Sequence, residues 1–487
     1  MRFLRTTTLF FITIVSYNTV QAQKLESAQF INSFSSQEIS TLAGIPVAYG
    51  VDLYKVRYYT SDARGEEHIA SGLACIPQDD TVRFPLACYQ HGTVDGREDV
   101  PSRLAGGYQL PLILSAFGYV TCAADFVGLG DSPGIHPYVH ATTQATAGID
   151  LLFAVREMSE DDNYPPFYVT DQLFIGGYSQ GGHASMAAHK YLETMYPGEF
   201  DIAAAAHMSG PYSISEVMID FTLGDQPYNT VSYLAWVALG YMEAYPEFLD
   251  TFTLEKVFKP EYLDDIKAFR DEAIGRGELN SRITNRLMTD YGAVLCREIL
   301  LEDVLNSILS DPEYPLNQAL MDNDVYDWAP QSLTNLYYCE GDEQVSFENA
   351  ILAANVMTQN GAPNVQALRM DNTFPLNHVQ CVSPAATSVV FFWGSMQQLL
   401  TSANDIELDD EVGIYYANDL LILDIPVSYS SSDLELKAYS LDGRLISSRP
   451  VAAGMSEHLM NLDSESMIVM SLFADGRLIK TQKFFTR

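Results

Sequence analysis

Basic residues are scarce in this chain of 487 residues. Its 27 lysines and arginines stand against 63 aspartates and glutamates, which gives a formal net charge of −36. A protein that binds nucleic acid needs a basic footprint to meet the phosphates, and electrostatic docking on an anionic membrane needs one too. The composition argues against both classes. With 47% hydrophobic and 18% charged residues, the chain is not of disordered type, and its length suggests two to four domains.

Cysteine is also sparse, with six residues and no Cys-x-x-Cys spacing, so no zinc site is expected. Four cysteines lie in apolar, strand-like runs, where cysteine behaves as a small hydrophobic residue. We therefore expect free buried thiols at Cys75, Cys88, Cys122 and Cys339. Cys296 and Cys381 form the one pair for which the sequence leaves a disulfide open.

The N-terminus has no apolar run long enough to span a bilayer, since residues 9–15 are too few. Arg2 and Arg5 precede this run, and the small residues of Val20-Gln21-Ala22 follow it. This order predicts a signal peptide over residues 1–22 and an exported protein, in which disulfides are permitted. A buried N-terminal strand is the alternative.

Residues 177–181 read Gly-Tyr-Ser-Gln-Gly and fit the pattern Gly-x-Ser-x-Gly. Residues 171–176 before them are typical of a short buried strand, and residues 182–189 of the first turns of a helix. A sharp turn in this context exposes a serine hydroxyl at the top of a sheet, and only glycine avoids a clash two residues either side. A chance match is the alternative for so short a motif. The flanks favour Ser179 as a nucleophile.

The rhythm of the chain from residue 45 to 400 indicates a mostly parallel sheet. Val51–Tyr59 alternates with period two, and residues 69–76 predict a second, antiparallel strand. Short apolar runs then alternate with helical stretches, as buried parallel strands do in βαβ units. These runs are residues 84–89, 119–125, 172–177, 203–208, 336–339 and 365–370. The predicted fold is α/β, a doubly wound, mostly parallel sheet of the α/β-hydrolase plan, in a catalytic domain of residues 23–404.

Two segments break this rhythm. Residues 211–330 are aromatic and helical in pattern, which predicts a cap inserted between the sixth and seventh core strands. Within it, residues 231–239 are strongly apolar and either form the core of the cap or line an acyl pocket. After an acidic linker at 405–411, residues 412–487 contain short strands with turn signals, which predicts a small β-sandwich.

A serine hydroxyl needs a base to take its proton, and that base needs an acid to orient it. On this plan the acid follows the serine in the chain and the histidine comes last. Asp342 lies in the turn after the strand at 336–339; Glu340 and Glu343 are neighbouring candidates, and a plain turn residue is the alternative. His378 is the only histidine between Asp342 and the C-terminal segment. We expect Ser179, Asp342 and His378 to form a catalytic triad.

The reaction also needs two backbone donors for the oxyanion. The first is expected to be the amide of Gln180, directly after the nucleophile. The second is assigned to the amide of Thr93 in the loop after the third strand, with Gly92 as the alternative. His91 is expected to shape that loop by hydrogen bonding.

No metal or cofactor is expected for this chemistry. His136 and His140 lie four residues apart, as metal ligands on a helix can, but no nearby carboxylate or His-Glu-x-x-His pattern supports a site. The stretch Asp125–Pro133 follows the fourth strand and is interpreted as architecture beside the serine.

These motifs together resemble the secretory-lipase branch of the α/β hydrolases. The resemblance is carried by Gln90-His91-Gly92, by Asp125–Pro133 with His136-Pro137-Tyr138, by Gly176–Gly182 and by Ser209–Tyr212, together with the helical cap. It implies hydrolysis of a small-molecule or lipid carboxylic ester. A serine peptidase of the same fold is the first alternative, and a surface binding protein without turnover is the second.

Residues 412–487 resemble the sorting domain of the type IX secretion route of Gram-negative bacteria. The matching stretches are Leu436–Leu445 and Gly476–Phe485. The resemblance implies that secretion machinery is a partner and that the protein is secreted or displayed at the cell surface. A structural or carbohydrate-binding sandwich is the alternative.

Overall fold

The computed structural model describes residues 23–245, 252–401, 412–417, 420–430, 432–440, 445–459, 466–474 and 477–486. The signal peptide predicted at 1–22 and the linker predicted at 405–411 lie outside these residues.

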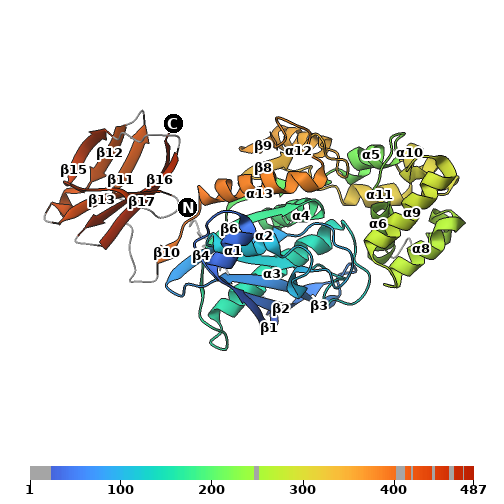
Figure 1. Ribbon diagram of the computed structural model, residues 1–487, viewed down its shortest axis with the longest axis horizontal. Coiled ribbons are helices and arrows are strands. Elements are labelled where there is room, and N and C mark those ends of the chain that lie inside the picture. The colour runs from blue at the N-terminus through green and yellow to red at the C-terminus, as the bar shows by residue number, and fades with distance from the viewer. Residues whose placement is uncertain are drawn as a thin grey trace, which may run out of the picture.

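A ten-stranded sheet forms the centre of the larger part of the molecule (Figure 1). Its strand order is β1-β2-β3-β5-β4-β6-β7-β8-β9, with β10 paired to β4. The first three strands are antiparallel, and the six from β5 to β9 run parallel, as the sequence predicted. The strands are β1 (Leu25–Phe34), β2 (Val51–Ser61), β3 (Glu67–Pro77), β4 (Val82–Gln90), β5 (Val120–Ala124), β6 (Tyr168–Tyr178), β7 (Asp201–Met208), β8 (Leu333–Tyr338), β9 (Val365–Arg369) and β10 (Leu400–Thr401).

Helices cover both faces of this sheet, each over its own apolar cluster. One cluster holds side chains from α1 (Ser36–Ala43), α2 (Gln109–Ala116) and α13 (His378–Gly394). The other holds side chains from α3 (Ala141–Glu160), α4 (Gln180–Met195) and α12 (Glu348–Gln359). The central strands are buried on both sides, which explains why their sequences are continuous apolar runs.

The segment between β7 and β8 is helical, and Figure 1 shows most of it gathered beyond one end of the sheet. In α6, Trp236 stacks on Tyr138 of the body at 4.9 Å and meets Phe269 of α8 edge-on at 5.1 Å. This helix therefore packs both within the cap and against the body. The elements are η2 (Ile214–Met218), α5 (Ile219–Leu223), α6 (Ser232–Ala244), α7 (Leu254–Val257), α8 (Pro260–Arg270), α9 (Arg276–Tyr291), η4 (Cys296–Ile299), α10 (Glu302–Ser310) and α11 (Pro315–Asp322).

The C-terminal strands form two antiparallel sheets of their own, in the orders β11-β12-β15 and β14-β13-β16-β17. Side chains from both sheets share one apolar cluster, as in a β-sandwich. The strands are β11 (Gly413–Ala417), β12 (Leu420–Ile425), β13 (Leu434–Ser440), β14 (Leu445–Val451), β15 (Gly454–Leu459), β16 (Ser466–Ala474) and β17 (Arg477–Thr486). Among the residues described, no helix is both long and apolar enough to cross a bilayer.

Candidate active site

Ser179 occupies the sharp turn between β6 and α4, with φ 61° and ψ −124°. A positive φ is strained for a residue with a side chain. The turn is held because the Ser179 amide donates to Met208 O of β7 at 2.9 Å. A Cβ at Gly177 would lie 2.1 Å from Gly181 O, and one at Gly181 would lie 2.0 Å from Gln90 O. The two flanking glycines are therefore required by close backbone approach, as the motif predicted.

Three side chains from distant parts of the sequence form one hydrogen-bonded chain. Ser179 Oγ lies 2.8 Å from His378 Nε2, and His378 Nδ1 lies 2.7 Å from Asp342 Oδ2. Each of the three residues is only 6% exposed. This arrangement lets the imidazole accept the serine proton while the carboxylate fixes its tautomer and orientation. The structure thus brings together the three residues selected from the sequence.

The turn after β8 gives the two oxygens of Asp342 different partners. Oδ1 accepts the amides of Gln344 and Val345 at 3.0 and 2.9 Å, which leaves Oδ2 for His378. Glu340, a neighbouring candidate, pairs instead with Arg369 at 2.8 Å. Glu343, the other candidate, accepts the backbone amide of His378 at 3.0 Å. Geometry therefore separates the three acids that sequence alone left close together.

His378 is the first residue of α13, and two contacts fix the start of that helix. Asn377 forms a capping box with Gln380, in which each side chain accepts the other residue's amide. The phenol of Tyr178, next to Ser179, donates to His378 O at 2.6 Å. No role was predicted for Asn377 or Tyr178, although the pattern Asn-x-x-Gln around the histidine is a helix-start signal.

The predicted oxyanion donors flank the serine. Gln180 opens α4, and Gly92 comes so close that a Cβ there would lie 3.6 Å from Ser179 Cβ. In the described part of the chain, the amides of Gln180 and Thr93 donate to no protein acceptor. The Thr93 hydroxyl lies 2.7 Å from the Tyr138 phenol, which ties this loop to the body. His91 is buried, with Nδ1 2.7 Å from Gly92 O, and so shapes the loop as expected.

His136 holds the side chain of Gln180. Burial lowers the pKa of His136 to about 3, so its ring is neutral. Nδ1 donates to Val127 O at 2.7 Å, and Nε2 therefore accepts from Gln180 Nε2 at 2.7 Å. This contact was not predicted, because His136 was considered only as a metal ligand. No group of three His, Cys, Asp or Glu side chains in the described ranges could hold a metal ion.

The cap is tied to both loops of the site. Tyr233 of α6 donates to Gln344 Oε1 in the acid turn at 2.9 Å, and Tyr228 donates to Gln344 O at 3.0 Å. Arg276 at the start of α9 donates to Val94 O, next to Thr93, at 3.2 Å. The cap therefore contacts both the turn that carries Asp342 and the loop that carries Thr93.

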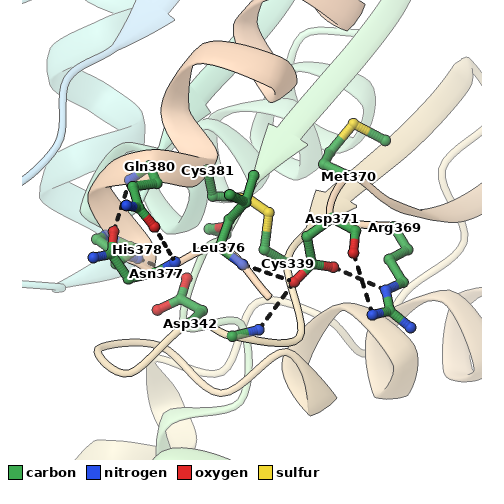
Figure 2. The surroundings of a disulfide bond; sticks show 12 residues. Cys339, Asp342, Arg369, Met370, Asp371, Leu376, Asn377, His378, Gln380 and Cys381 are labelled. Carbon is green, nitrogen blue, oxygen red and sulfur yellow. Dashed lines mark hydrogen bonds and ion pairs between the residues drawn. A yellow bond between two sulfur atoms is a disulfide. The ribbon is translucent and has the colours of Figure 1, made fainter. Parts of the chain in front are cut away.

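The free thiol expected at Cys339 was wrong, and the pair that the sequence left open, Cys296 with Cys381, is not joined. The disulfide joins Cys339 to Cys381, with Cα atoms 6.1 Å apart (Figure 2). Cys296 is instead a free thiol buried in the cap. Cys339 ends the strand run before the acid turn, and α13 places Cys381 beside it. The free buried thiols expected at Cys75, Cys88 and Cys122 are confirmed.

Comparisons with known proteins place this geometry in a known fold. No family model matches the chain, and the search of curated proteins gives no match. Among solved structures, a protein from Legionella pneumophila described as a hydrolase is 26% identical, with TM-score 0.67, over 76% of this chain and 97% of that one. The rice cell wall degrading esterase LipA from Xanthomonas oryzae is 23% identical, with TM-score 0.63, over 76% and 94%. Candida antarctica lipase A is 16% identical, with TM-score 0.52, over 72% and 77%.

The larger part of the chain therefore has the α/β-hydrolase fold, with separate antiparallel sheets at its C-terminal end. Its structural neighbours are hydrolases, esterases and lipases of that fold.

Proposed function

We propose that this protein is a secreted serine hydrolase that cleaves carboxylic esters through an acyl-enzyme. The observation that carries the proposal is the continuous chain from Ser179 Oγ through His378 to Asp342, at 2.8 and 2.7 Å. A buried serine with a base on its hydroxyl and an acid behind that base is the constellation for acyl transfer.

In the first half of the reaction, Ser179 Oγ attacks the ester carbonyl and His378 Nε2 takes its proton. The Gln180 and Thr93 amides stabilise the negative oxygen of the tetrahedral intermediate. His378 then gives its proton to the leaving alcohol. In the second half, water attacks the acyl-enzyme by the same route and releases the acid.

Aromatic side chains between the cap and the body favour a substrate with an apolar acyl group. Tyr138 of the body contacts Tyr233 and Trp236 of the cap beside the oxyanion loop, with ring centroids 5.9 and 4.9 Å apart. A peptidase would use a free carboxylate to hold the amino terminus of a peptide. Glu343, next to Asp342, is already bonded to the His378 amide, which favours the ester substrate.

We also propose export through the predicted signal peptide and the C-terminal sheets as a sorting domain. Their resemblance to a secretion domain supports this, together with a hydrolase site that uses no residue beyond His378. The secretion machinery would then be the partner of residues 412–487.

The test is hydrolysis of p-nitrophenyl esters from acetate to palmitate, beside an aminoacyl-anilide, by the wild type and Ser179→Ala. We expect ester turnover that falls at least about a thousandfold in Ser179→Ala, because the nucleophile is lost. Ester turnover that survives in Ser179→Ala would contradict the mechanism, and cleavage of the anilide alone would favour the peptidase. Export is tested with the same substrate. Ester hydrolysis is measured in the medium and in the cells, for the full chain and for a chain that ends at residue 404.

A further inference from the structure

The acid and the base of the triad stand on two separate loops. Asp342 follows β8 and His378 follows β9, so their 2.7 Å contact depends on how the loops are held together. The loops meet backbone to backbone: a Cβ at Gly341 would lie 2.7 Å from Leu376 O and 2.9 Å from Leu376 N. Because glycine has no side chain, Gly341 cannot itself hold the two loops at a fixed distance. Other groups must therefore do so.

The carboxylate of Asp371 lies between these loops, as Figure 2 shows. Its Oδ2 accepts the amide of Gly341, one residue before the acid, at 3.1 Å. The same oxygen accepts the amide of Leu376, two residues before the base, at 3.2 Å. One oxygen atom therefore bridges the two loops that carry the acid–base pair.

Arg369 holds the bridging carboxylate in place. Its Nε donates to Asp371 Oδ1 at 2.8 Å, and its Nη1 pairs with Glu340 at 2.8 Å. The Asp371 side chain has no exposed surface. Although burial raises the pKa of the Asp371 carboxyl, the hydrogen bonds from Arg369 and from the backbone amides outweigh it and hold the pKa below its usual value. The Asp371 carboxyl is therefore ionised at the pH values at which a triad of this kind works.

The disulfide ties the same two segments at a second point. Cys339 lies three residues before Asp342, and Cys381 lies three residues after His378. Both sulfur-bearing residues are fully buried. The carboxylate bridge and the disulfide therefore join the same two segments at two separate points.

We propose that Asp371 is a positioning residue for the Asp342–His378 pair, and that with the Cys339–Cys381 disulfide it forms a clamp across the two loops. The inference rests on the proposed function. A purely structural role would affect only stability. The clamp, in contrast, predicts that losing Asp371 or the disulfide slows the transfer of the Ser179 proton to His378. Misplacing the base by about 1 Å costs on the order of a hundredfold in rate.

The first test is Asp371→Asn in the full chain, because asparagine keeps the shape but loses the charge that Arg369 holds. We expect kcat to fall about ten- to hundredfold with KM within about twofold, since substrate contacts are unchanged. We also expect the acid limb of the kcat/KM profile to move to lower pH, because a weaker contact with the Asp342 carboxylate stabilises the imidazolium less.

The matched control is Glu157→Gln. Glu157 also accepts two backbone amides, those of Lys24 and Leu25, but at the far edge of the sheet. It should lower stability without changing kcat or the acid limb. Equal kinetic losses in the two variants would overturn the proposal, and so would a folded Asp371→Asn with wild-type kcat and acid limb.

The second variant is Cys339→Ser with Cys381→Ser, which keeps the proposal testable if Asp371→Asn does not fold. We expect this variant to show the same fall in kcat and the same shift of the acid limb. An unchanged kcat would show that the disulfide is not part of the clamp. A downfield proton NMR signal from the His378 Nδ1–H gives a readout without substrate. That signal should broaden or vanish in Asp371→Asn and persist in Glu157→Gln and Ser179→Ala.

The NMR readout separates the two failures. If the signal depends on Asp371 but no Ser179-dependent ester turnover occurs, the proposed function is wrong and the clamp stands. If Ser179-dependent turnover occurs but neither the signal nor kcat depends on Asp371, the clamp is wrong and the function stands.

Discussion

At the scale of single residues, the glycines around Ser179 are the most demanding positions. The strained serine is tolerated because backbone from three strands closes around it, and that closeness leaves no room for a methyl group at position 181. We expect Gly181→Ala to lower the free energy of unfolding by about 3 kcal/mol or more, because a Cβ 2.0 Å from Gln90 O must displace backbone.

Urea unfolding measures this loss, with Gly198→Ala as the control. Gly198 also has a positive φ, 84°, but a Cβ there meets nothing within 4 Å. It should cost only about 1–2 kcal/mol, the penalty of the left-handed conformation alone. Equal losses in the two variants would show that backbone approach is not the reason for glycine at position 181.

The residues of the triad could be selected from the sequence, and those that support it could not. Ser179 has a motif, and Asp342 and His378 follow it in a fixed order after recognisable strands. Their catalytic roles stay predictions until the variants are assayed. Asp371 and the partner of Cys381 have no local pattern, because their contacts arise only when the loops after β8 and β9 meet.

At the scale of elements, the start of α13 links helix stability to the site. Asn377→Ala removes the cap of a helix whose first residue is His378. We expect it to lower the free energy of unfolding by about 1 kcal/mol and also to lower kcat several-fold, because the base loses its anchor.

Ser35→Ala is the control for the cap. Ser35 and Glu38 form the same capping box at α1, remote in sequence from the triad. Chemical denaturation should show a similar loss in both variants, while only Asn377→Ala changes kcat. A fall in kcat in both would mean that the effect is global destabilisation.

The central strands were easier to predict than the edges. Strands buried on both faces are continuous apolar runs, and all six parallel strands were found from that pattern. β1 was missed because it lies at the edge of the sheet, where Leu25 is its only buried residue. β15 gives an equally weak strand signal, since Gly454–Leu459 includes glutamate and histidine and no β-branched residue.

At the scale of the whole molecule, buried neutral histidines make the fold sensitive to acid. Burial lowers the pKa of His136 to about 3, of His140 and His183 to about 4, and of His207 well below its usual value. The unfolded chain takes up these protons near pH 6.5, whereas the folded protein does not. Stability is therefore full above about pH 6.5 and is lost as the pH falls toward 4.

We expect the free energy of unfolding to fall steadily between pH 6.5 and 5, a window in which exposed carboxylates stay ionised. Each histidine adds up to about 1.4 kcal/mol per pH unit. His183→Gln should be less stable at pH 8 but should show a shallower slope. Urea titrations at several pH values measure both, and an unchanged slope would exclude His183 as a contributor.

The order of strands in the sheet also bears on how the protein is made. The serine elbow is complete once β7 has paired with β6, by residue 208, whereas the acid and the base come after β8 and β9 at the far side of the sheet. More than a hundred residues of cap separate the two halves of the machinery. If the proposed function holds, a chain emerging from the ribosome carries Ser179 for about 200 further residues, of 487 in all, before His378 is added. The enzyme would then be inactive until the last parallel strand of the sheet, β9, has been synthesised.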